Sequence, residues 1–549
     1  MGTLDWVVIG IFFLALIGII VWVVKQKQND SADYFLGGRD ATWLAIGASI
    51  FASNIGSEHL IGLAGAGASS GMAMAHWEIQ GWMILILGWV FVPFYSRSMV
   101  YTMPEFLERR YNPQSRTILS VISLISYVLT KVAVTVYAGG LVFQQVFGIK
   151  ELWGIDFFWI AAIGLVVLTA LYTIFGGMKS VLYTSVLQTP ILLLGSLIIL
   201  VLGFKELGGW DEMMSICSAV TVNEYGDTMT QLIRDNNDPN FPWLGALVGS
   251  AIIGFWYWCT DQFIVQRVLS GKNEKEARRG TIFGAYLKLL PVFLFLIPGM
   301  IAFALHQKYI GAGGEGFLPL LANGTANADA AFPTLVAKLL PAGVKGLVVC
   351  GILAALMSSL ASLFNSSAML FTIDFYKRFK PETPEKKLVG IGQIATVVIV
   401  ILGILWIPIM RSVGDVLYTY LQDVQSVLAP GIAAAFLLGI CWKRTSAKGG
   451  MWGLIAGMII GLTRLGAKVY YSNTAITDSS MFKYLFYDLN WLFFCGWMFL
   501  FCIIVVIAVS LMTEAPSAEK IQGLVFGTST PEQKAATRAS WNHWDIIHT

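Results

Sequence analysis

The sequence predicts an all-α membrane protein with many spanning helices, and three observations indicate this fold class. Hydrophobic residues make up 56% of the 549 residues, and the mean hydropathy is +0.70. Only 13% of the residues are charged, whereas a soluble domain carries about 25%. The apolar runs are continuous instead of alternating, which argues against a β-barrel. We therefore expect a helical protein that crosses the membrane many times.

Hydropathy read in a window of roughly 19 residues predicts about thirteen spans in order along the chain. One N-terminal span, 4–24, lies in an extra segment, 1–40. Two sets of five spans follow, in 41–204 and 243–440, and two further spans lie in 441–512. A polar loop, 205–242, separates the two sets, and a polar tail covers 513–549. The remaining spans are 42–66, 72–96, 116–146, 156–175, 181–204, 243–266, 281–305, 341–376, 388–410, 415–440, 449–467 and 489–512.

Positive charge in the short loops predicts the orientation of these spans. Lysine and arginine concentrate in alternate loops, which the positive-inside rule assigns to the cytoplasm. The N-terminus and the loops 205–242 and 307–340 are then outside, and the tail 513–549 is a mobile or surface-lying segment inside. We expect a multi-pass protein of the plasma membrane. The positive loops lie at 25–27, 97–110, 272–279, 377–387 and 443–448.

Two composition features exclude other classes. The net charge of +3 is too small to indicate a nucleic-acid partner. The six cysteines lie almost all inside apolar runs, without metal-ligand spacing or a disulfide framework, and are expected to be small buried hydrophobes. The sequence makes no prediction of oligomeric state.

Polar side chains gather in particular spans, where their burial is costly and needs a reason. Any one of them could join neighbouring helices, and Ser358 and Ser359 could bond to carbonyls of their own helix. The whole set offers donors and acceptors in many directions, which suits a neutral polyhydroxylated molecule. A carboxylate solute would more naturally meet an unpaired cation. The set is Asn54, Ser57, Glu58, His59, Glu78, Asp261, Gln262, Arg267, Lys288, Ser358, Ser359, Gln422 and Asp423.

Glycines accompany the polar residues and predict interrupted helices. The stretch FASNIGSEHLIGLAGAGA, 51–68, mixes both kinds, and GSAIIGFWYWCTDQ, 249–262, is similar. Irregular backbone at membrane depth is tolerated only where it lines a cavity or is covered by protein. The two stretches hold corresponding places if spans two to six and seven to eleven are paired halves. This is the inverted-repeat pattern of secondary transporters, which place their site at broken helices.

Motifs over most of the chain are similar to those of the sodium/solute symporter family, within it the sodium/glucose cotransporter branch. The resemblance implies the LeuT-type five-plus-five inverted repeat with additional flanking helices. Many members have fourteen helices, so a final helix is expected to be absent here. The matching motifs are FASNIGSEHLIGLAG (51–65), YTMPEFLERRY (101–111), WYWCTDQFIVQRVL (256–269), YLKLLPVF (286–293), LMSSLASLFNSSAMLFTIDFY (356–376) and AAAFLLGICWKR (433–444).

The resemblance implies roles for individual residues at a sugar site and its gates. Tyr257 matches the aromatic inner gate that stacks under the sugar, and Asn54 is its hydrogen-bond partner. Trp258 neighbours the site. The outer gate matches Leu63, Trp77 and Tyr418, and the sugar-bonding positions match His59, Glu78, Lys288 and Gln422.

The resemblance also implies a site for co-transported sodium. Sodium is a hard cation that favours oxygen ligands. The ligands would be the backbone carbonyls of Ala52, Ile55 and Ala355 and the hydroxyls of Ser358 and Ser359. Such a set supplies five oxygens without a full buried charge.

Three residues depart from the family pattern. Ser185 stands where the family usually has an aspartate, and Ala355 where two-sodium members have a serine. Both family groups help to form a second sodium site, so we expect one sodium per sugar. Gly254 replaces a threonine or asparagine that touches the sugar in relatives, which leaves the preferred sugar open. The pair Glu58–His59 also occurs in inositol-carrying relatives.

The resulting hypothesis is sodium-driven uptake of a hexose of the glucose or galactose type by alternating access. Alternatives are a sodium-coupled carrier of myo-inositol, another polyol or a carboxylate, and a sugar sensor that does not transport. A membrane enzyme is disfavoured because the sequence has no nucleophile elbow, His/Glu metal motif or phosphate loop.

Overall fold

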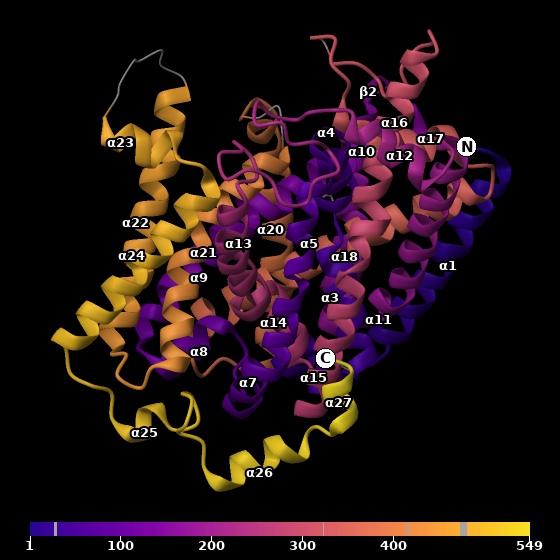
Figure 1. Cartoon of the computed structure of the whole chain (residues 1–549). Helices are drawn as coiled ribbons and strands as arrows, with labels where there is room; N and C mark the ends of the chain where they lie inside the picture. Colours follow the sequence, from indigo (N-terminus) through magenta and orange to yellow (C-terminus); the bar gives the residue numbers. More distant parts are fainter. Residues whose placement is uncertain (27–29, 57, 322, 414–416, 473–479) are drawn as a thin grey trace.

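The computed structural model describes residues 1–26, 30–56, 58–321, 323–413, 417–472 and 480–549. The side chains at 129–130, 409–413, 417–423 and 472 lie outside this description. Most described residues lie in helices that run between two ends of the molecule (Figure 1). The loops after α11 and α16 lie at the end that is uppermost in Figure 1, and the C-terminal segment lies at the opposite end. The expected all-α membrane fold is confirmed.

The first part of the chain runs from the N-terminal helix to a long double helix. Its helices are α1 (Thr3–Val24), α2 (Ser31–Leu36), η1 (Gly37–Arg39), α3 (Trp43–Asn54), η2 (Glu58–Leu63), α4 (Ala64–Ser70), η3 (Gly71–Met74), α5 (Ala75–Ile79), η4 (Gln80–Trp82), α6 (Met83–Ile86), η5 (Leu87–Phe91), α7 (Val92–Ser98), α8 (Met103–Arg110), α9 (Pro113–Ser126), η6 (Tyr127–Val132), α10 (Ala133–Phe147) and α11 (Phe157–Leu207). The short strands β1 (Glu151–Leu152) and β2 (Ile155–Asp156) pair antiparallel before α11.

The second part also contains an interrupted helix that long helices follow. Its helices are α12 (Trp210–Ser218), α13 (Trp243–Phe255), η7 (Trp256–Thr260), α14 (Gln262–Leu269), α15 (Glu274–Lys288), η8 (Val292–Leu296), α16 (Ile297–Gly311), η9 (Ala328–Ala330), α17 (Ala331–Leu339), α18 (Val344–Met369), η10 (Leu370–Tyr376), α19 (Lys377–Phe379), α20 (Glu385–Val413) and α21 (Leu417–Cys441). The last part comprises α22 (Ala447–Ser472), α23 (Met481–Lys483), η11 (Tyr484–Asp488), α24 (Trp491–Met512), α25 (Ala518–Ile521), α26 (Pro531–Ala539) and α27 (His543–Ile547).

Ten helices among the described residues are long and apolar enough to cross a membrane, and two shorter apolar helices, α3 and α10, accompany them. The expected spans 156–175 and 181–204 lie on either side of Gly177, where φ +52° and ψ −148° are not helical and the two helices of α11 meet at a kink. The number of spans stays a prediction. Burial separates central from peripheral helices: 89% of the apolar window of α18 and its extension is buried, against 22% for α1.

The two expected helix interruptions are present in the structure. Helix α3 ends at Asn54, and Ile55 takes an extended conformation with φ −76° and ψ 104°. Helix α13 with η7 ends at Thr260, and Asp261 is extended with φ −76° and ψ 127°. Each break follows the first helix of one of the two expected sets of five, as the inverted-repeat interpretation requires.

Glycines allow α3 to approach α15 closely, which brings the first break near the end of α15. A Cβ added at Gly47 in α3 would lie 2.9 Å from the Gly280 carbonyl oxygen in α15. Any side chain at Gly47 would therefore push the two helices apart. The same approach places Asn54, at the end of α3, beside Lys288, at the end of α15.

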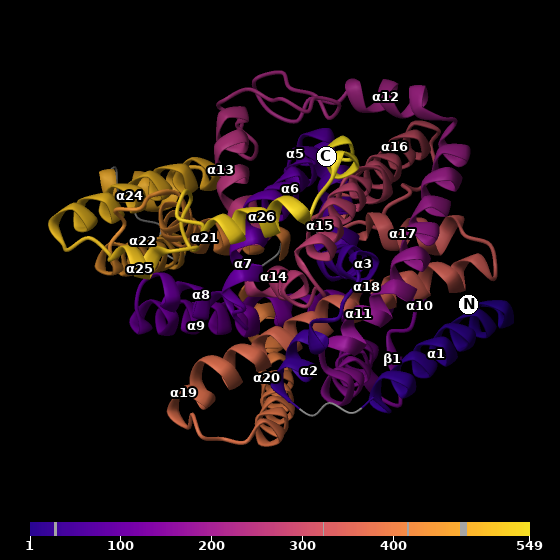
Figure 2. The same cartoon turned by 90° about the horizontal axis from the view of Figure 1, so that it is seen from below.

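The C-terminal segment 513–549 lies across the ends of α7 and α15, as the view from below shows (Figure 2). Arg97 in α7 donates to Ser529 Oγ at 2.9 Å, and Arg279 in α15 pairs with Asp545 at 2.7 Å. Arg278 also donates to Ser540 Oγ. The segment expected to be mobile or surface-lying is thus fastened to the surface at several points.

Candidate functional site

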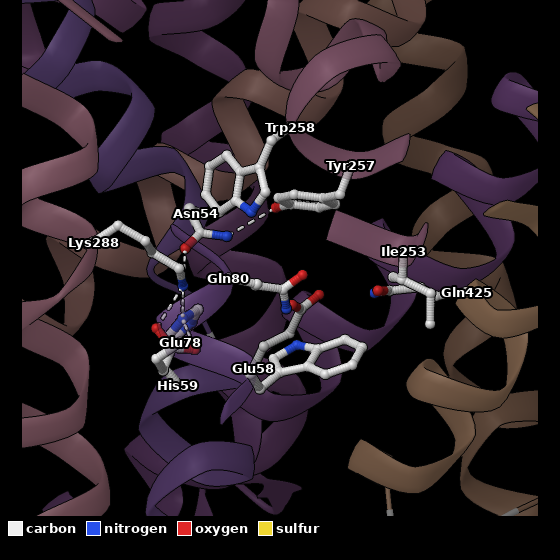
Figure 3. Close-up of a pocket in the computed structure, with 11 residues that line it drawn as sticks. Asn54, Glu58, His59, Glu78, Gln80, Ile253, Tyr257, Trp258, Lys288 and Gln425 are labelled. Carbon is white, nitrogen blue, oxygen red and sulfur yellow. Dashed lines mark hydrogen bonds and ion pairs between the residues drawn. The ribbon is translucent and has the colours of Figure 1, made fainter. Parts of the chain in front are cut away.

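A polar cavity with a free volume of about 30 Å³ lies beside the two broken helices (Figure 3). Its residues come from α3 and η2 on either side of the first break, from α5 and η4, from α13 and η7 before the second break, and from α15 and α21. The lining side chains are Asn54, Glu58, His59, Trp77, Glu78, Gln80, Ile253, Tyr257, Trp258, Lys288 and Gln425.

Lys288 is the centre of the hydrogen-bond network on one wall of the cavity. Its Nζ lies 2.6 Å from Glu78 Oε2, 2.6 Å from Asn54 Oδ1 and 2.9 Å from His59 Nε2. His59 Nε2 also lies 3.3 Å from Glu78 Oε1. Lys288 and Glu78 are nearly fully buried. A buried ammonium and carboxylate are tolerated because each compensates the other and both are hydrogen-bonded.

His59 adds a ring with two polar nitrogen atoms to this wall. Its Nε2 faces both a donor, Lys288 Nζ, and an acceptor, Glu78 Oε1. Among the described residues, its buried Nδ1 has no hydrogen-bond partner. The site therefore holds one buried polar atom that protein atoms of the described residues do not satisfy.

Aromatic rings form another part of the lining. Tyr257 receives a hydrogen bond on its hydroxyl oxygen from Asn54 Nδ2 at 3.0 Å. The rings of Tyr257 and Trp258 meet edge to face with centroids 4.9 Å apart, and Lys288 Nζ lies 5.5 Å from the Trp258 ring. Apolar ring faces beside convergent polar groups are typical of small-molecule sites.

Of the residues expected to form the outer gate, one lines the cavity, one does not, and one lies outside the described side chains. Trp77 lines the cavity, and its ring lies 5.6 Å from that of Trp491. Leu63 is buried in η2 and is not among the lining residues that the structure describes. The side chains of Tyr418 and Gln422 fall outside the described residues, so their expected roles stay predictions.

The expected sodium ligands lie around the first helix break. Ser359 Oγ in α18 donates to the carbonyl oxygen of Ser53 at 2.8 Å and lies 3.3 Å from that of Ile55. Carbonyls at a helix end lack intrahelical donors and are free to bind a ligand. A Cβ added at Gly56 would lie 2.8 Å from Ser359 Oγ, so only glycine leaves room there.

The other expected ligands are buried on the same two helices. Ala52 lies in the last turn of α3, and Ala355 lies one turn before Ser359 in α18. Ser358 Oγ lies 3.2 Å from Ser185 Oγ, and Ser185 donates to the Val181 carbonyl at 2.6 Å. The hydroxyl at Ser185 is thus engaged with protein atoms.

Three lining residues were missed by the sequence interpretation: Gln80, Ile253 and Gln425. Gln425 lies three residues after the predicted Gln422, and residues three apart share a helix face. Gln80 follows Glu78 by two residues and reaches the cavity because the helix tightens to a 3₁₀ turn at η4. The helical spacing from Gln422 could therefore have predicted Gln425 as a lining residue. The 3₁₀ turn that brings Gln80 to the cavity could not be read from the sequence.

A second buried ion pair lies against Tyr257 and is not part of the cavity lining described. Lys131 Nζ in η6 lies 2.6 Å from Asp261 Oδ2 at the second break, and the Tyr127 hydroxyl donates to Asp261. Lys131 Nζ also lies 4.7 Å from the Tyr257 ring centroid. Arg267 Nε donates to Ser53 Oγ at 3.0 Å, which joins α14 to α3.

Comparison with known proteins found relatives in sequence. Sodium/myo-inositol cotransporter 2 of Homo sapiens is 37% identical over 538 residues, which cover 95% of this chain and 79% of that protein. Sodium/glucose cotransporter 1 of Ovis aries is 37% identical over 529 residues, which cover 93% of this chain and 79% of that protein.

Solved structures show the same fold at lower identity. A substrate-bound, outward-open sodium-coupled sialic acid symporter aligns with a TM-score of 0.74 over 94% of this chain and 99% of that chain, at 22% identity. Mhp1, a nucleobase-cation-symport-1 family transporter with bromovinylhydantoin bound, aligns with a TM-score of 0.50 over 93% of this chain and 98% of that chain, at 13% identity. These neighbours have the LeuT fold, which confirms the expected fold class.

Interrupted helices beside a polar cavity in this fold define a multi-pass membrane transporter of the secondary active type. The match to the sodium:solute symporter family covers residues 34–457. The chain belongs to this family, and the expected resemblance is confirmed.

Proposed function

We propose that the chain drives uptake of a hexose of the glucose or galactose type by coupling it to inward movement of sodium. The observation that carries this proposal is the arrangement of Lys288, Glu78, His59 and Asn54 in one cavity with the Tyr257 and Trp258 rings. A sugar ring needs donors and acceptors around its edge and an apolar surface against its C–H face. This cavity offers both.

The charges of the lining favour a neutral solute over a carboxylate. Two carboxyl groups, Glu58 and Glu78, line the described cavity together with one ammonium, that of Lys288. Lys288 is already paired with Glu78 at 2.6 Å, so an anionic solute would find no free cation among the described lining residues. Burying another negative charge there would be costly.

The first helix break offers a short route from ion to solute. The carbonyls of Ser53 and Ile55 contact Ser359, where we place sodium, and Asn54 between them contacts Lys288 and Tyr257. An ion that orders this break therefore also positions the solute side of the site. Coupling requires that sodium bind the outward-open state better than the inward-open state.

We further propose that one sodium moves per sugar. Ser185 supplies a neutral hydroxyl where the family usually has an aspartate, and Ala355 has no side-chain oxygen where two-sodium members have a serine, so the carboxylate and hydroxyl that help to form a second sodium site are absent. One charge moving through 100 mV supplies about 2.3 kcal/mol, and a tenfold gradient about 1.4 kcal/mol. One sodium then supports a sugar gradient of roughly four hundred-fold, whereas two would support on the order of 10⁵-fold. Reversal potentials that return two charges per sugar would overturn this stoichiometry.

The proposed location is the plasma membrane, with the N-terminus outside and the tail 513–549 inside. This orientation follows from the positive loops, including those that hold Arg97 and Arg279. Labelling of single cysteines introduced at each end of the molecule, in intact cells, tests it.

Uptake of labelled glucose, galactose and myo-inositol into proteoliposomes, with and without an inward sodium gradient, tests the proposed function. Sodium-dependent accumulation of a hexose is expected. Accumulation of myo-inositol alone would favour the second candidate, a polyol carrier, which the relative from Homo sapiens supports. Sodium-dependent binding without accumulation would favour a sensor, and no sodium-dependent binding or uptake of any of these solutes would overturn the proposal.

Replacing Ser359 with Ala tests the ion site. The loss of its hydroxyl from the carbonyls of Ser53 and Ile55 should abolish sodium dependence. Ser270→Ala is the matched control, because Ser270 is also buried and donates to a carbonyl of its own segment, that of Gln266. Unchanged sodium dependence in Ser359→Ala would remove this ion site.

A further inference from the structure

Gln80 is a buried polar residue of the cavity to which no role has been given so far. It lies in η4, two residues after Glu78, and its side chain lines the cavity between the Lys288 network and Gln425 (Figure 3). Only 6% of the residue is exposed. Within the described part of the chain, its Oε1 is buried and has no hydrogen-bond partner. A buried acceptor without a donor is unfavourable, and native structures leave few of them.

A glycine on the facing helix makes room for this amide. Gly254 lies in α13, and a Cβ added there would overlap Gln80 Oε1 and lie 3.3 Å from both Gln80 Cδ and Met83 Cγ. Gly254 has no positive φ, so the backbone itself does not require glycine. What the missing side chain at Gly254 provides is the space that the Gln80 amide fills.

The position of the unpaired oxygen indicates what would satisfy it. Gln80 lines the same cavity as Glu78 and Lys288, which are already paired with each other, and its oxygen lies next to Gly254. The partner that it lacks is a donor, and the donors of a neutral polyhydroxylated solute are hydroxyl groups. A structural role for Gln80 as a bridge between helices would need a protein partner for this oxygen, and the described residues provide none.

We propose that Gln80 is a further substrate-contacting residue, which accepts a hydrogen bond from one hydroxyl of the transported solute, and that Gly254 sets specificity by leaving its amide in place. This inference rests on the proposed transport of a hexose or polyol. In this proposal, a hydroxyl on one edge of the solute donates to Gln80. Hydroxyls on another edge bond to the network around Lys288. A solute that lacks the hydroxyl facing Gln80 leaves the amide oxygen unpaired and is discriminated against.

Substitutions at both positions test this contact without relying on one variant. Gln80→Leu keeps a similar size and removes the acceptor. Gly254→Ala leaves Gln80 unchanged and displaces its amide, and it is compatible with folding because alanine favours a helix and the overlap involves the flexible end of a side chain. Gly164→Ala in α11 is the matched control, since a Cβ at Gly164 meets nothing within 4 Å. Monodispersity and thermal unfolding in detergent verify the fold of each variant.

The measurement is the KM of sodium-dependent uptake for the preferred solute and for its set of single deoxy analogues. For the preferred solute, Gln80→Leu and Gly254→Ala should each raise KM roughly 3- to 10-fold, the usual effect of one lost hydrogen bond. One deoxy analogue, transported poorly by the unmodified protein, should lose its disadvantage in both variants. Gly254→Ala should add less than about twofold in a protein that already carries Gln80→Leu, because both changes remove one contact. Gly164→Ala should behave as the unmodified protein.

Two failures are distinguishable. If the unmodified protein accumulates the solute but Gln80→Leu leaves both KM and the ranking of the analogues unchanged, this inference is overturned and the proposed function stands. The same holds if Gly254→Ala alters KM equally with and without Gln80. If the unmodified protein transports no hexose or polyol in response to sodium, the proposed function falls and takes this inference with it.

Discussion

Two buried ion pairs lie near Tyr257: Lys288 with Glu78 and Lys131 with Asp261. Their nitrogen–oxygen distances are equal, but the residues around them differ. Lys288 with Glu78 and Lys131 with Asp261 each span 2.6 Å, and all four side chains are at most 5% exposed. The first pair lines a cavity and shares its ammonium with Asn54 and His59. The second lies among aromatic rings, with the centroids of Tyr257 and Phe263 4.7 and 4.9 Å from Lys131 Nζ.

The difference shows that the surroundings of an ion pair, more than its length, indicate what it can do. A buried pair is weak evidence for stability, because a well-packed apolar replacement is often as stable. A pair beside a cavity can exchange contacts with a solute. A pair enclosed by rings has no such partner, and we expect it to serve the packing of η6 against the second helix break.

The largest expected effect comes from the pair that lines the cavity. Lys288→Ala leaves Glu78 buried with only His59 beside it, which should cost about 3–5 kcal/mol of stability and stop sodium-driven uptake. Replacing both residues, as Lys288→Met with Glu78→Leu, should restore much of the stability and none of the uptake. Thermal unfolding and proteoliposome uptake measure the two effects. Uptake restored by the double replacement would mean that the pair does not contact the solute.

The enclosed pair should respond in the opposite way to a double replacement. Lys131→Met alone leaves Asp261 unpaired and should also cost about 3–5 kcal/mol. Combining it with Asp261→Asn removes the charge but keeps a side chain that can cap α14, because asparagine caps helices as well as aspartate does. We expect this double variant to recover both stability and most of the uptake. A stable double variant without uptake would show that the Lys131–Asp261 pair takes part in transport, as the Lys288–Glu78 pair does.

A smaller effect is expected at the hydroxyl of Tyr257, which lies between the two pairs. Tyr257→Phe removes the hydrogen bond from Asn54 Nδ2 and retains the ring. The lost bond should cost about 0.5–1.5 kcal/mol, which corresponds to roughly a 3- to 10-fold rise in the KM for the solute. Tyr257→Leu, which also removes the ring, should weaken binding further. Equal KM values for the two variants would show that the ring contributes nothing.

The smallest effect is expected at the ion pair between Arg279, which is partly exposed, and Asp545, which is buried under the C-terminal segment. Asp545→Asn should cost about 1 kcal/mol, because Arg279 remains partly solvated and asparagine can still accept the hydrogen bond from the Asn542 backbone. Although partial burial opposes ionisation, Arg279 and the backbone of Asn542 hold the pKa of Asp545 below its ordinary value. The contribution is therefore present at neutral pH and is lost as pH falls through this lowered pKa.

Unfolding midpoints of the unmodified protein and Asp545→Asn, measured between about pH 6 and pH 3, test this sign. The difference between the two proteins should shrink toward the acid end. A difference that grows as the pH falls would contradict the assignment.

The fold and one wall of the site were predictable because their signals are local in the sequence. Polar residues among glycines marked both helix breaks, at Ile55 and at Asp261. Lys131 carried no such signal, because it stands in an apolar run and its partner Asp261 is 130 residues away. The gap that hydropathy places between the expected spans 156–175 and 181–204 falls at Gly177, whose positive φ interrupts the helical backbone inside α11.

The bonds made by the segment 513–549 restrict how the helices beneath it can move relative to each other. Arg97 ends the helical run that carries Glu78, and Arg278 and Arg279 lie in the helix that ends at Lys288. The same segment bonds to all three arginines. Any movement that separated these two helices at that end would have to break those bonds, whereas rotation of both as one body leaves them intact. While the segment stays docked, the distance between Glu78 and Lys288 is therefore expected to be constant through the transport cycle.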